Sequence, residues 1–144
     1  MRGPVKFIYQ IVVRVYVRAE VLWWFEQSKR DLKMAEELLK SCLFEGTAYH
    51  SHQAAEKALK ALVICRGGYH LTHSCKFLLD QLRSQGLDVE ELYSDARELD
   101  AHYLISRYPN AASAPPYELY DELKAKDLLN RARRVVDFVE RNLK

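Results

Sequence analysis

The chain has 144 residues, of which 49% are hydrophobic and 29% charged, with only five Gly and four Pro. This length and composition exclude a disordered chain and fit one folded domain. The formal net charge of +2 is too small to indicate nucleic-acid binding by itself. Cys42, Cys65 and Cys75 are an odd set without regular spacing, which favours reduced thiols in an intracellular protein over a disulfide framework.

Residues 7–17 form the most apolar segment of the sequence. Arg2 and Lys6 precede it as in a signal peptide, but Gln10 and Arg14 interrupt it and no small-residue cleavage site follows. The segment is also shorter than the ~20 residues that span a bilayer. Its β-branched residues favour an extended strand or an irregular packed arm. We therefore expect a cytoplasmic protein that has no membrane partner.

The rest of the chain is predicted to be all-α. We expect an N-terminal extension over residues 1–18 and a helical bundle domain over residues 19–144. Apolar residues recur at helical spacing in five segments, which are about 19–42, 47–66, 74–85, 88–105 and a last helix from near Pro116. Thr72 or Ser74 can cap the third helix, and Asp88 with Glu91 resembles a capping box for the fourth. The short connections predict an antiparallel, up-and-down bundle of four to five helices.

A metal site is the first chemical possibility that the sequence raises. Cys65, His70, His73 and Cys75 fall within eleven residues, and Zn²⁺ takes Cys and His as ligands. The spacing of these four residues matches no standard zinc motif. The sequence also has no Gly-rich loop of the kind that binds phosphate. We expect neither a metal nor a cofactor.

The second predicted helix concentrates polar side chains in its first half. They are His50, His52, Gln53, Glu56, Lys57 and Lys60. One interpretation is an ordinary polar face opposite a stripe of Ala and Leu. The other is a polar wall that faces a ligand.

The end of the fourth predicted helix is the most distinctive part of the sequence. His102, Tyr103, Arg107, Tyr108 and Asn110 lie together there. Arg binds phosphate through two hydrogen bonds, and Tyr stacks on bases. The alternative is a helix end that is held by aromatic packing and an Arg–Asp pair.

At this point the sequence resembles the HEPN family, the "higher eukaryotes and prokaryotes nucleotide-binding" domain. Three blocks carry the resemblance, and together they extend from about Trp23 to Leu143. The first is Trp24 with Ser28-Lys29-Arg30-Asp31-Leu32 and Ala35; the second is His52-Gln53-Ala54-Ala55-Glu56-Lys57-Ala58-Leu59-Lys60-Ala61, followed by His73; the third is Leu99-Asp100, Tyr103 and Arg107-Tyr108-Pro109-Asn110.

The resemblance implies a helical bundle that dimerises and often pairs with a minimal nucleotidyltransferase encoded beside it, as in a two-gene toxin–antitoxin system. Some members of the family are ribonuclease toxins with an Arg followed, after four to six residues, by a His. Arg107 has no such His. Arg97 with His102, and Arg66 with His73, match the spacing formally, and we interpret both as coincidences.

The leading hypothesis is therefore a non-catalytic module that binds a nucleotide, an RNA phosphate or a nucleotidyltransferase partner. Its candidate binding residues are His52, Gln53, Glu56, Lys57, Tyr103, Arg107, Tyr108 and Asn110. The alternative is a metal-independent ribonuclease in which Arg107 stabilises phosphate charge and His102 acts as general acid or base. A third possibility is a purely structural interaction domain.

Self-association is a further expectation. The second helix offers the small residues Ala54, Ala55, Ala58 and Ala61, which allow close approach of a neighbour. The apolar N-terminal extension is expected to pack on its own bundle or on a partner subunit. A two-fold homodimer is the simplest closed arrangement.

Overall fold

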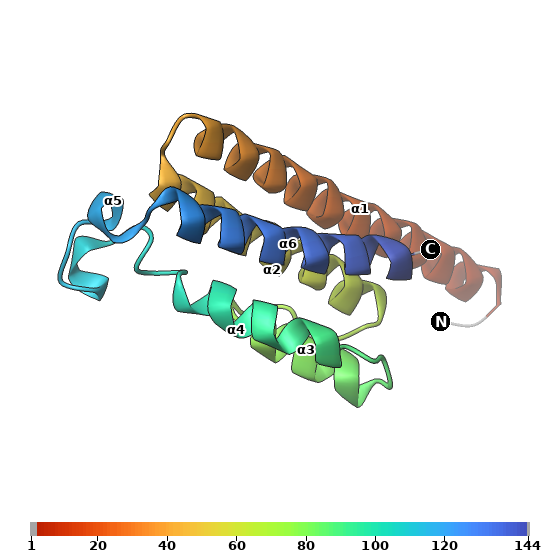
Figure 1. Ribbon diagram of the computed structural model, residues 1–144. Helices are drawn as coiled ribbons and strands as arrows, with labels where there is room; N and C mark the ends of the chain where they lie inside the picture. The colour runs from red at the N-terminus through yellow and green to blue at the C-terminus, as the bar shows by residue number, and fades with distance from the viewer. Residues whose placement is uncertain (1–2, 144) are drawn as a thin grey trace.

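The computed structural model describes residues 3–143, and these residues form an all-α bundle, as the sequence predicts. Among them there is no strand. In Figure 1, α1, α2, α4 and α6 alternate in direction, which confirms the up-and-down arrangement. The helices are α1 (Pro4–Lys40), α2 (Phe44–Cys65), α3 (Cys75–Ser84), α4 (Tyr93–Ala101), α5 (Pro116–Leu119) and α6 (Glu122–Asn142), with short 3₁₀ turns η1 (Glu90–Leu92) and η2 (Pro109–Ala111).

Helix α2 is the centre of the bundle. It contacts α1, α6, α3 and α4, and most of its residues are buried. Its alanines, which include Ala54, Ala55, Ala58 and Ala61, have no exposed surface. Small side chains there let the neighbouring helices approach the α2 backbone closely. These alanines are therefore part of the core, and the expectation that they offer a dimer surface is wrong.

Helix α1 begins much earlier than predicted. We expected residues 7–17 to form a strand or an irregular arm, but the chain is helical from Pro4 onwards. The helix also continues without a break across the expected boundary between residues 18 and 19. Pro4 suits the first turn of a helix, and no Gly or Pro interrupts the sequence from there to Lys40. β-branched residues lower helix stability by only a few tenths of a kcal/mol each, so an established helix continues through them.

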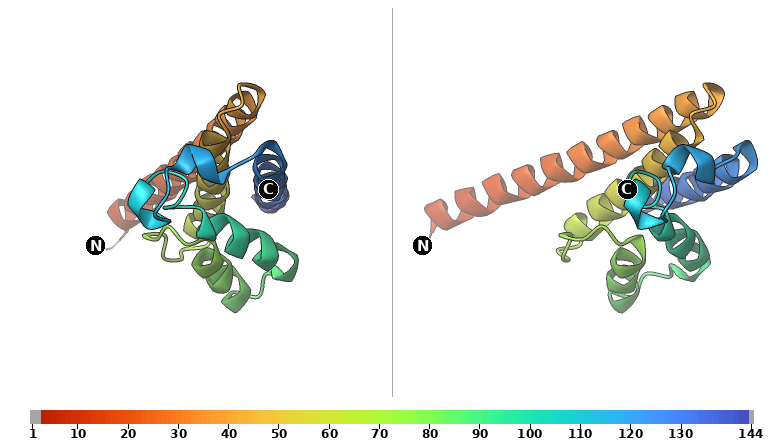
Figure 2. Two further views of the ribbon diagram at one scale, coloured as in Figure 1. Left: turned by 60° about the vertical axis from the view of Figure 1, so that its left-hand side comes forward. Right: turned by 90° about the vertical axis from the view of Figure 1, so that its left-hand side faces the viewer.

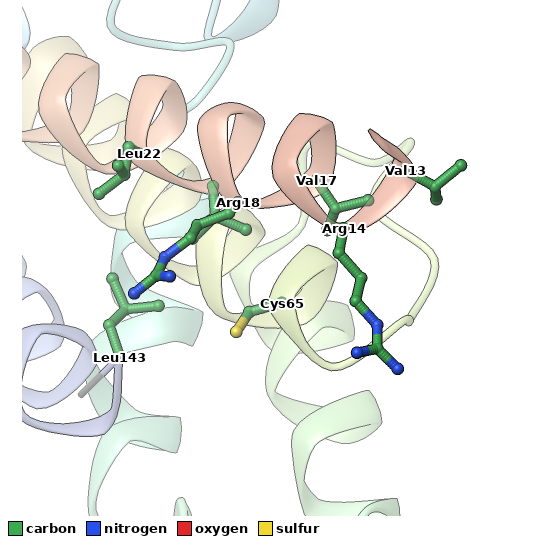
Figure 3. A pocket seen from close by; sticks show the side chains of 8 residues that line it. Val13, Arg14, Val17, Arg18, Leu22, Cys65 and Leu143 are labelled. Atoms are coloured by element: carbon green, nitrogen blue, oxygen red, sulfur yellow. The ribbon is translucent and has the colours of Figure 1, made fainter. Parts of the chain in front are cut away.

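The first half of α1 projects beyond the rest of the molecule, as the right-hand view of Figure 2 shows. At its base a groove of about 520 Å³ opens between α1 and the ends of α2 and α6. Valine side chains of α1 form the groove with Cys65 and Leu143, and Arg14 and Arg18 extend on the same side (Figure 3). No helix within residues 3–143 is long and apolar enough to cross a membrane.

The second half of the chain differs from the prediction at three boundaries. Asp88 does not start a long helix, because its carboxylate accepts only the Glu90 N–H, at 3.2 Å, before the η1 turn. Helix α4 ends at Ala101 rather than near residue 105. The last predicted helix is split, because Tyr120 is extended and buried while Asp121 caps α6 by accepting the Lys124 N–H at 2.8 Å.

Candidate functional site

Arg107, just after α4, lies among three tyrosine rings. Its guanidinium carbon is 4.6 Å from the ring centroid of Tyr49, 4.8 Å from that of Tyr103 and 4.9 Å from that of Tyr108. Helix α2 supplies Tyr49, and the turns after α4 supply the other three residues. We call these four residues the Arg107 corner. Cation–π contacts of this kind hold a guanidinium in place without neutralising its charge.

The guanidinium of Arg107 has no carboxylate partner among residues 3–143. Its Nε is buried and makes no hydrogen bond, and Nη1 donates only a long 3.5 Å bond to the Tyr49 hydroxyl. The alternative of an Arg–Asp pair at this helix end is therefore wrong, although the aromatic packing is present. Because an Arg carries five N–H donors, most of the hydrogen-bonding capacity of this side chain remains unused.

Beneath the corner, His52 forms a buried link to the start of α3. His52 has no exposed surface; its Nε2 lies 2.9 Å from Asp100 Oδ1, and the Gln53 amide nitrogen lies 3.3 Å from its Nδ1. If Gln53 donates to Nδ1, Nε2 carries the proton that goes to Asp100. The His52 ring also lies against Tyr103, with centroids 5.1 Å apart.

The Asp100 carboxylate caps the start of α3. It accepts the backbone N–H of Cys75 at 2.8 Å, that of Lys76 at 3.0 Å and the Ser74 hydroxyl at 3.2 Å. Burial raises the pKa of Asp100, but the hydrogen bonds from His52, Lys76 and Cys75 outweigh this effect and lower it below its ordinary value. Asp100 is thus an ionised cap that joins α2, α3 and α4.

A buried carboxylate, Glu56, holds His73 against the corner. Glu56 is 2% exposed and pairs with Lys60 at 3.1 Å and with His73 Nδ1 at 3.0 Å. The exposed His73 ring stacks on Tyr103, with centroids 4.8 Å apart and planes at 20°. Tyr103 therefore contacts both His73 and Arg107, which makes its ring the centre of the site.

Two further contacts join α2 to α1. Asp31 of α1 binds His50 Nδ1 at 2.9 Å and Lys57 Nζ at 2.6 Å. Burial raises the pKa of Asp31, but its bonds with His50 and Lys57 lower it overall. Lys57 is thus held by α1 rather than pointing freely into solvent.

Seven of the eight predicted site residues fall into two groups. Arg107, Tyr103 and Tyr108 come together at the corner, with Tyr108 47% exposed. The α2 residues His52, Gln53 and Glu56 are buried and already bonded, and Lys57 pairs with Asp31. These α2 residues form neither a solvated face nor an open wall, but an internal polar network below the corner. Asn110 is exposed in the η2 turn.

His102, the alternative catalytic residue, belongs to another cluster. Its Nδ1 lies 2.8 Å from the Tyr120 hydroxyl and its Nε2 lies 3.3 Å from Glu98. Glu98 also pairs with Lys124. Burial lowers the pKa of His102, with Lys124 adding to this effect and Glu98 opposing it. Both ring nitrogens of His102 therefore have partners, Tyr120 just before α6 and Glu98, which itself pairs with Lys124 of α6.

His52, Cys75 and Asp100 bring three potential metal-ligand atoms within 4.8 Å of one another. Burial raises the pKa of the Cys75 thiol well above its ordinary value, and the Asp100 charge adds to this effect. A metal requires the thiolate and a carboxylate lone pair, whereas Asp100 already accepts four hydrogen bonds. The donor set fits a helix cap better than a metal centre.

Two residues of the site were missed from the sequence. Tyr49 lies one helical turn before Gln53, so helical spacing was sufficient to place it on the same face of α2. The sequence singles out His73 as a zinc candidate, as a chance motif match and as part of the family resemblance, but not as a binding residue. No local signal could have revealed its contact with Glu56, since the two lie 17 residues apart across a loop.

Comparison with known proteins gives consistent matches. The HEPN domain pattern matches residues 21–142. "Putative toxin MJ1304" of Methanocaldococcus jannaschii is 25% identical over 132 residues, covering 84% of this chain and 86% of that protein. The crystal structure of TT1696 from Thermus thermophilus has a TM-score of 0.80 and 33% identity, covering 85% of this chain and 97% of that chain. The crystal structure of ST0689, an archaeal HEPN homologue, has a TM-score of 0.73 and 31% identity, covering 87% of this chain and 98% of that chain.

Proposed function

The chain belongs to the HEPN domain family, and from that premise we propose that it is a non-catalytic module that binds a phosphate-bearing ligand at the Arg107 corner. The ligand is a nucleotide or the phosphate of an RNA. The observation that carries this proposal is the Arg107 guanidinium, which has no carboxylate partner among the described residues and is framed by three tyrosine rings.

An unpaired guanidinium between aromatic rings suits this class of ligand on two grounds. The free N–H groups of Arg107 can bind phosphate oxygens through charge-assisted hydrogen bonds. Tyr108 is 47% exposed and offers a face on which a base can stack. The two contacts together select a base joined to a phosphate rather than phosphate alone.

The α2 residues then have a supporting role. His52 and His73 both contact the Tyr103 ring, and Asp100 and Glu56 fix these two imidazoles in turn. Because Tyr103 contacts Arg107, this network sets the position of the guanidinium. We propose that His52, Gln53, Glu56 and Lys57 act through this packing rather than by touching the ligand.

Calorimetric titration tests the proposal. We expect AMP, ATP or a short single-stranded RNA to bind at least ~10-fold more tightly than adenosine, because only the phosphate engages Arg107. The affinity for RNA should fall with added salt. Equal affinity for adenosine, or no binding of any of these ligands at low salt, would contradict the proposal.

We further propose that the chain acts beside a minimal nucleotidyltransferase, in a two-gene system of the toxin–antitoxin kind. The family resemblance and the toxin name of the M. jannaschii relative support this role. The test is co-expression with a small nucleotidyltransferase encoded next to this chain. A stable complex on size-exclusion chromatography is expected, and separate elution of the two purified proteins would contradict it.

Ribonuclease activity, the alternative function, is not expected. Both nitrogens of His102 are engaged by Tyr120 and Glu98, so no free acid–base group is paired with Arg107 in the manner proposed from the sequence. Purified protein incubated with labelled single-stranded RNA should leave it intact. Cleavage that is lost in His102→Ala but kept in Lys33→Ala, a surface control, would establish the ribonuclease instead.

A homodimer remains our prediction, with a different surface from the one first expected. Exposed large apolar side chains recur along residues 104–123, the segment that also contains Arg107; they are Leu104, Tyr108, Tyr117, Leu119 and Leu123, between 39% and 79% exposed. A two-fold contact here would bring two corners together. Light scattering should give twice the 16.8 kDa chain mass, and Leu104→Ser/Leu123→Ser should halve it. A single-chain mass for the unmodified protein would refute the dimer.

A further inference from the structure

The N-terminal arm, residues 4–19 of α1, is a helix whose apolar side is left uncovered. Val5, Ile8, Ile11, Val12, Val15 and Tyr16 are each between 44% and 64% exposed. Monomeric proteins rarely expose so many contiguous apolar side chains unless the surface has a partner. The first part of the arm projects away from the bundle in Figure 2, and only its base, from Val13 to Arg18, borders the groove with Cys65 and Leu143. The rest of this chain therefore leaves most of the arm uncovered.

The arm carries an unusual share of the positive charge. Residues 4–19 contain Lys6, Arg14 and Arg18 and no Asp or Glu, whereas residues 20–144 contain 18 Lys and Arg with all 20 Asp and Glu. The arm is therefore basic and the bundle slightly acidic. Among the ion pairs formed within residues 3–143, none includes Lys6, Arg14 or Arg18.

Most apolar residues of the arm lie on one side of the helix, although Phe7 and Val17 lie among the basic residues. At 100° per residue, apolar residues of the arm fill an uninterrupted arc of about 200°, from Ile11 round to Val13. Lys6 and Arg18 border this arc at its two edges. Val21 and Phe25 are the residues through which α1 packs against the bundle. They lie on the side of the helix opposite to the centre of the apolar arc. The bundle therefore does not obstruct an approach to the apolar arc.

From this arrangement we propose that the arm binds the surface of a bilayer that contains anionic lipids. Its apolar arc enters the boundary between headgroups and acyl chains, and Lys6 and Arg18 contact lipid phosphates at the edges. A helix of a second copy would cover a stripe of roughly 100°, leaving half of the arc in water. It would also bring two basic arms together, whereas anionic headgroups complement their charge.

The sequence-based expectation of no membrane partner is reversed by this proposal. That expectation depended on the length of the apolar segment, which argues against spanning a bilayer but not against lying on one. The arm is about 24 Å long at 1.5 Å per residue, and aromatic Tyr9 and Tyr16 suit the interface between lipid and water.

Vesicle sedimentation tests the inference with the full chain. We expect binding to phosphatidylcholine vesicles that contain about 30% phosphatidylglycerol, at least ~10-fold weaker binding to pure phosphatidylcholine, and weakening by salt. Lys6→Glu/Arg18→Glu should reduce the binding at least ~10-fold. Lys33→Glu/Lys126→Glu makes the same charge change at exposed bundle sites and should reduce it much less.

Ile8→Ser/Val12→Ser tests the apolar contribution, and it should also reduce vesicle binding while the circular dichroism spectrum stays helical. Failure of the unmodified protein to bind the anionic vesicles would overturn the inference, as would an equal loss in the bundle control. If Ile8→Ser/Val12→Ser instead halves the molecular mass of the protein measured without lipid, the arm is a dimer interface and the lipid proposal is wrong.

Discussion

Asp100→Ala should destabilise the fold by about 2–4 kcal/mol, because it removes a charged acceptor from a mostly buried hydrogen-bond network. The substitution leaves the Nε2 of His52, a residue with no exposed surface, without its carboxylate partner. It also removes the acceptor for the N–H groups of Cys75 and Lys76 at the start of α3. Urea denaturation followed by circular dichroism measures the loss of unfolding free energy.

Asp100→Asn is the matched control, because it keeps the shape of the side chain and removes the charge. We expect it to cost less than Asp100→Ala. The folded-state pKa of Asp100 lies below its unfolded value of 3.8, so its stabilisation is present above that pH and is lost as pH falls through the folded pKa. The difference between unmodified protein and Asp100→Asn should therefore shrink below about pH 4. A cost under ~1 kcal/mol for Asp100→Ala at pH 7 would show that Asp100 does not organise α3.

Arg107→Ala should weaken nucleotide or RNA binding by about 10- to 150-fold, which corresponds to roughly 1.5–3 kcal/mol for a charge-assisted phosphate contact. Its helical content should be unchanged, because Arg107 lies outside the helices and pairs with no carboxylate of the described chain. Isothermal titration calorimetry measures the affinity. Affinity that is unchanged in the folded variant would remove Arg107 from the site.

Two substitutions control for a change in overall charge. Arg107→Lys keeps the charge but loses the planar donors and the stacking between tyrosines, so we expect an intermediate loss. Lys126→Ala removes an exposed cation of α6 and should leave the affinity within about twofold, since exposed ion pairs contribute little.

Much of the fold was predictable, because helical periodicity and polar caps are local signals. The apolar stripe of α2 and the Ser74 cap, which accepts the Phe77 N–H at 3.1 Å, were both predicted and are both present. The arm was mispredicted because β-branched residues indicate a strand only weakly and tertiary context decides. The break between α5 and α6 required recognition of Asp121 as a cap.

The site was only partly predictable, for a physical reason. Arg107, Tyr103 and Tyr108 are close in sequence, so their clustering at a helix end could be anticipated. The contacts below them join Asp31 to Lys57, Glu56 to His73, and His52 to Asp100 across separate segments of the chain. Sequence spacing within α2 could place these residues on faces of the helix, but not show that the neighbouring helices bury them.

The most direct test concerns the Arg107 Nε, which is buried and has no hydrogen-bond partner in the described structure. Its N–H resonance can be assigned in ¹⁵N-labelled protein as the arginine signal that is lost in Arg107→Lys. We predict that this signal shifts on addition of ATP or a short single-stranded RNA and shifts much less on addition of adenosine, which lacks the phosphate. A bound ligand that leaves the Arg107 signal unchanged would contradict the assignment of the corner as the phosphate site.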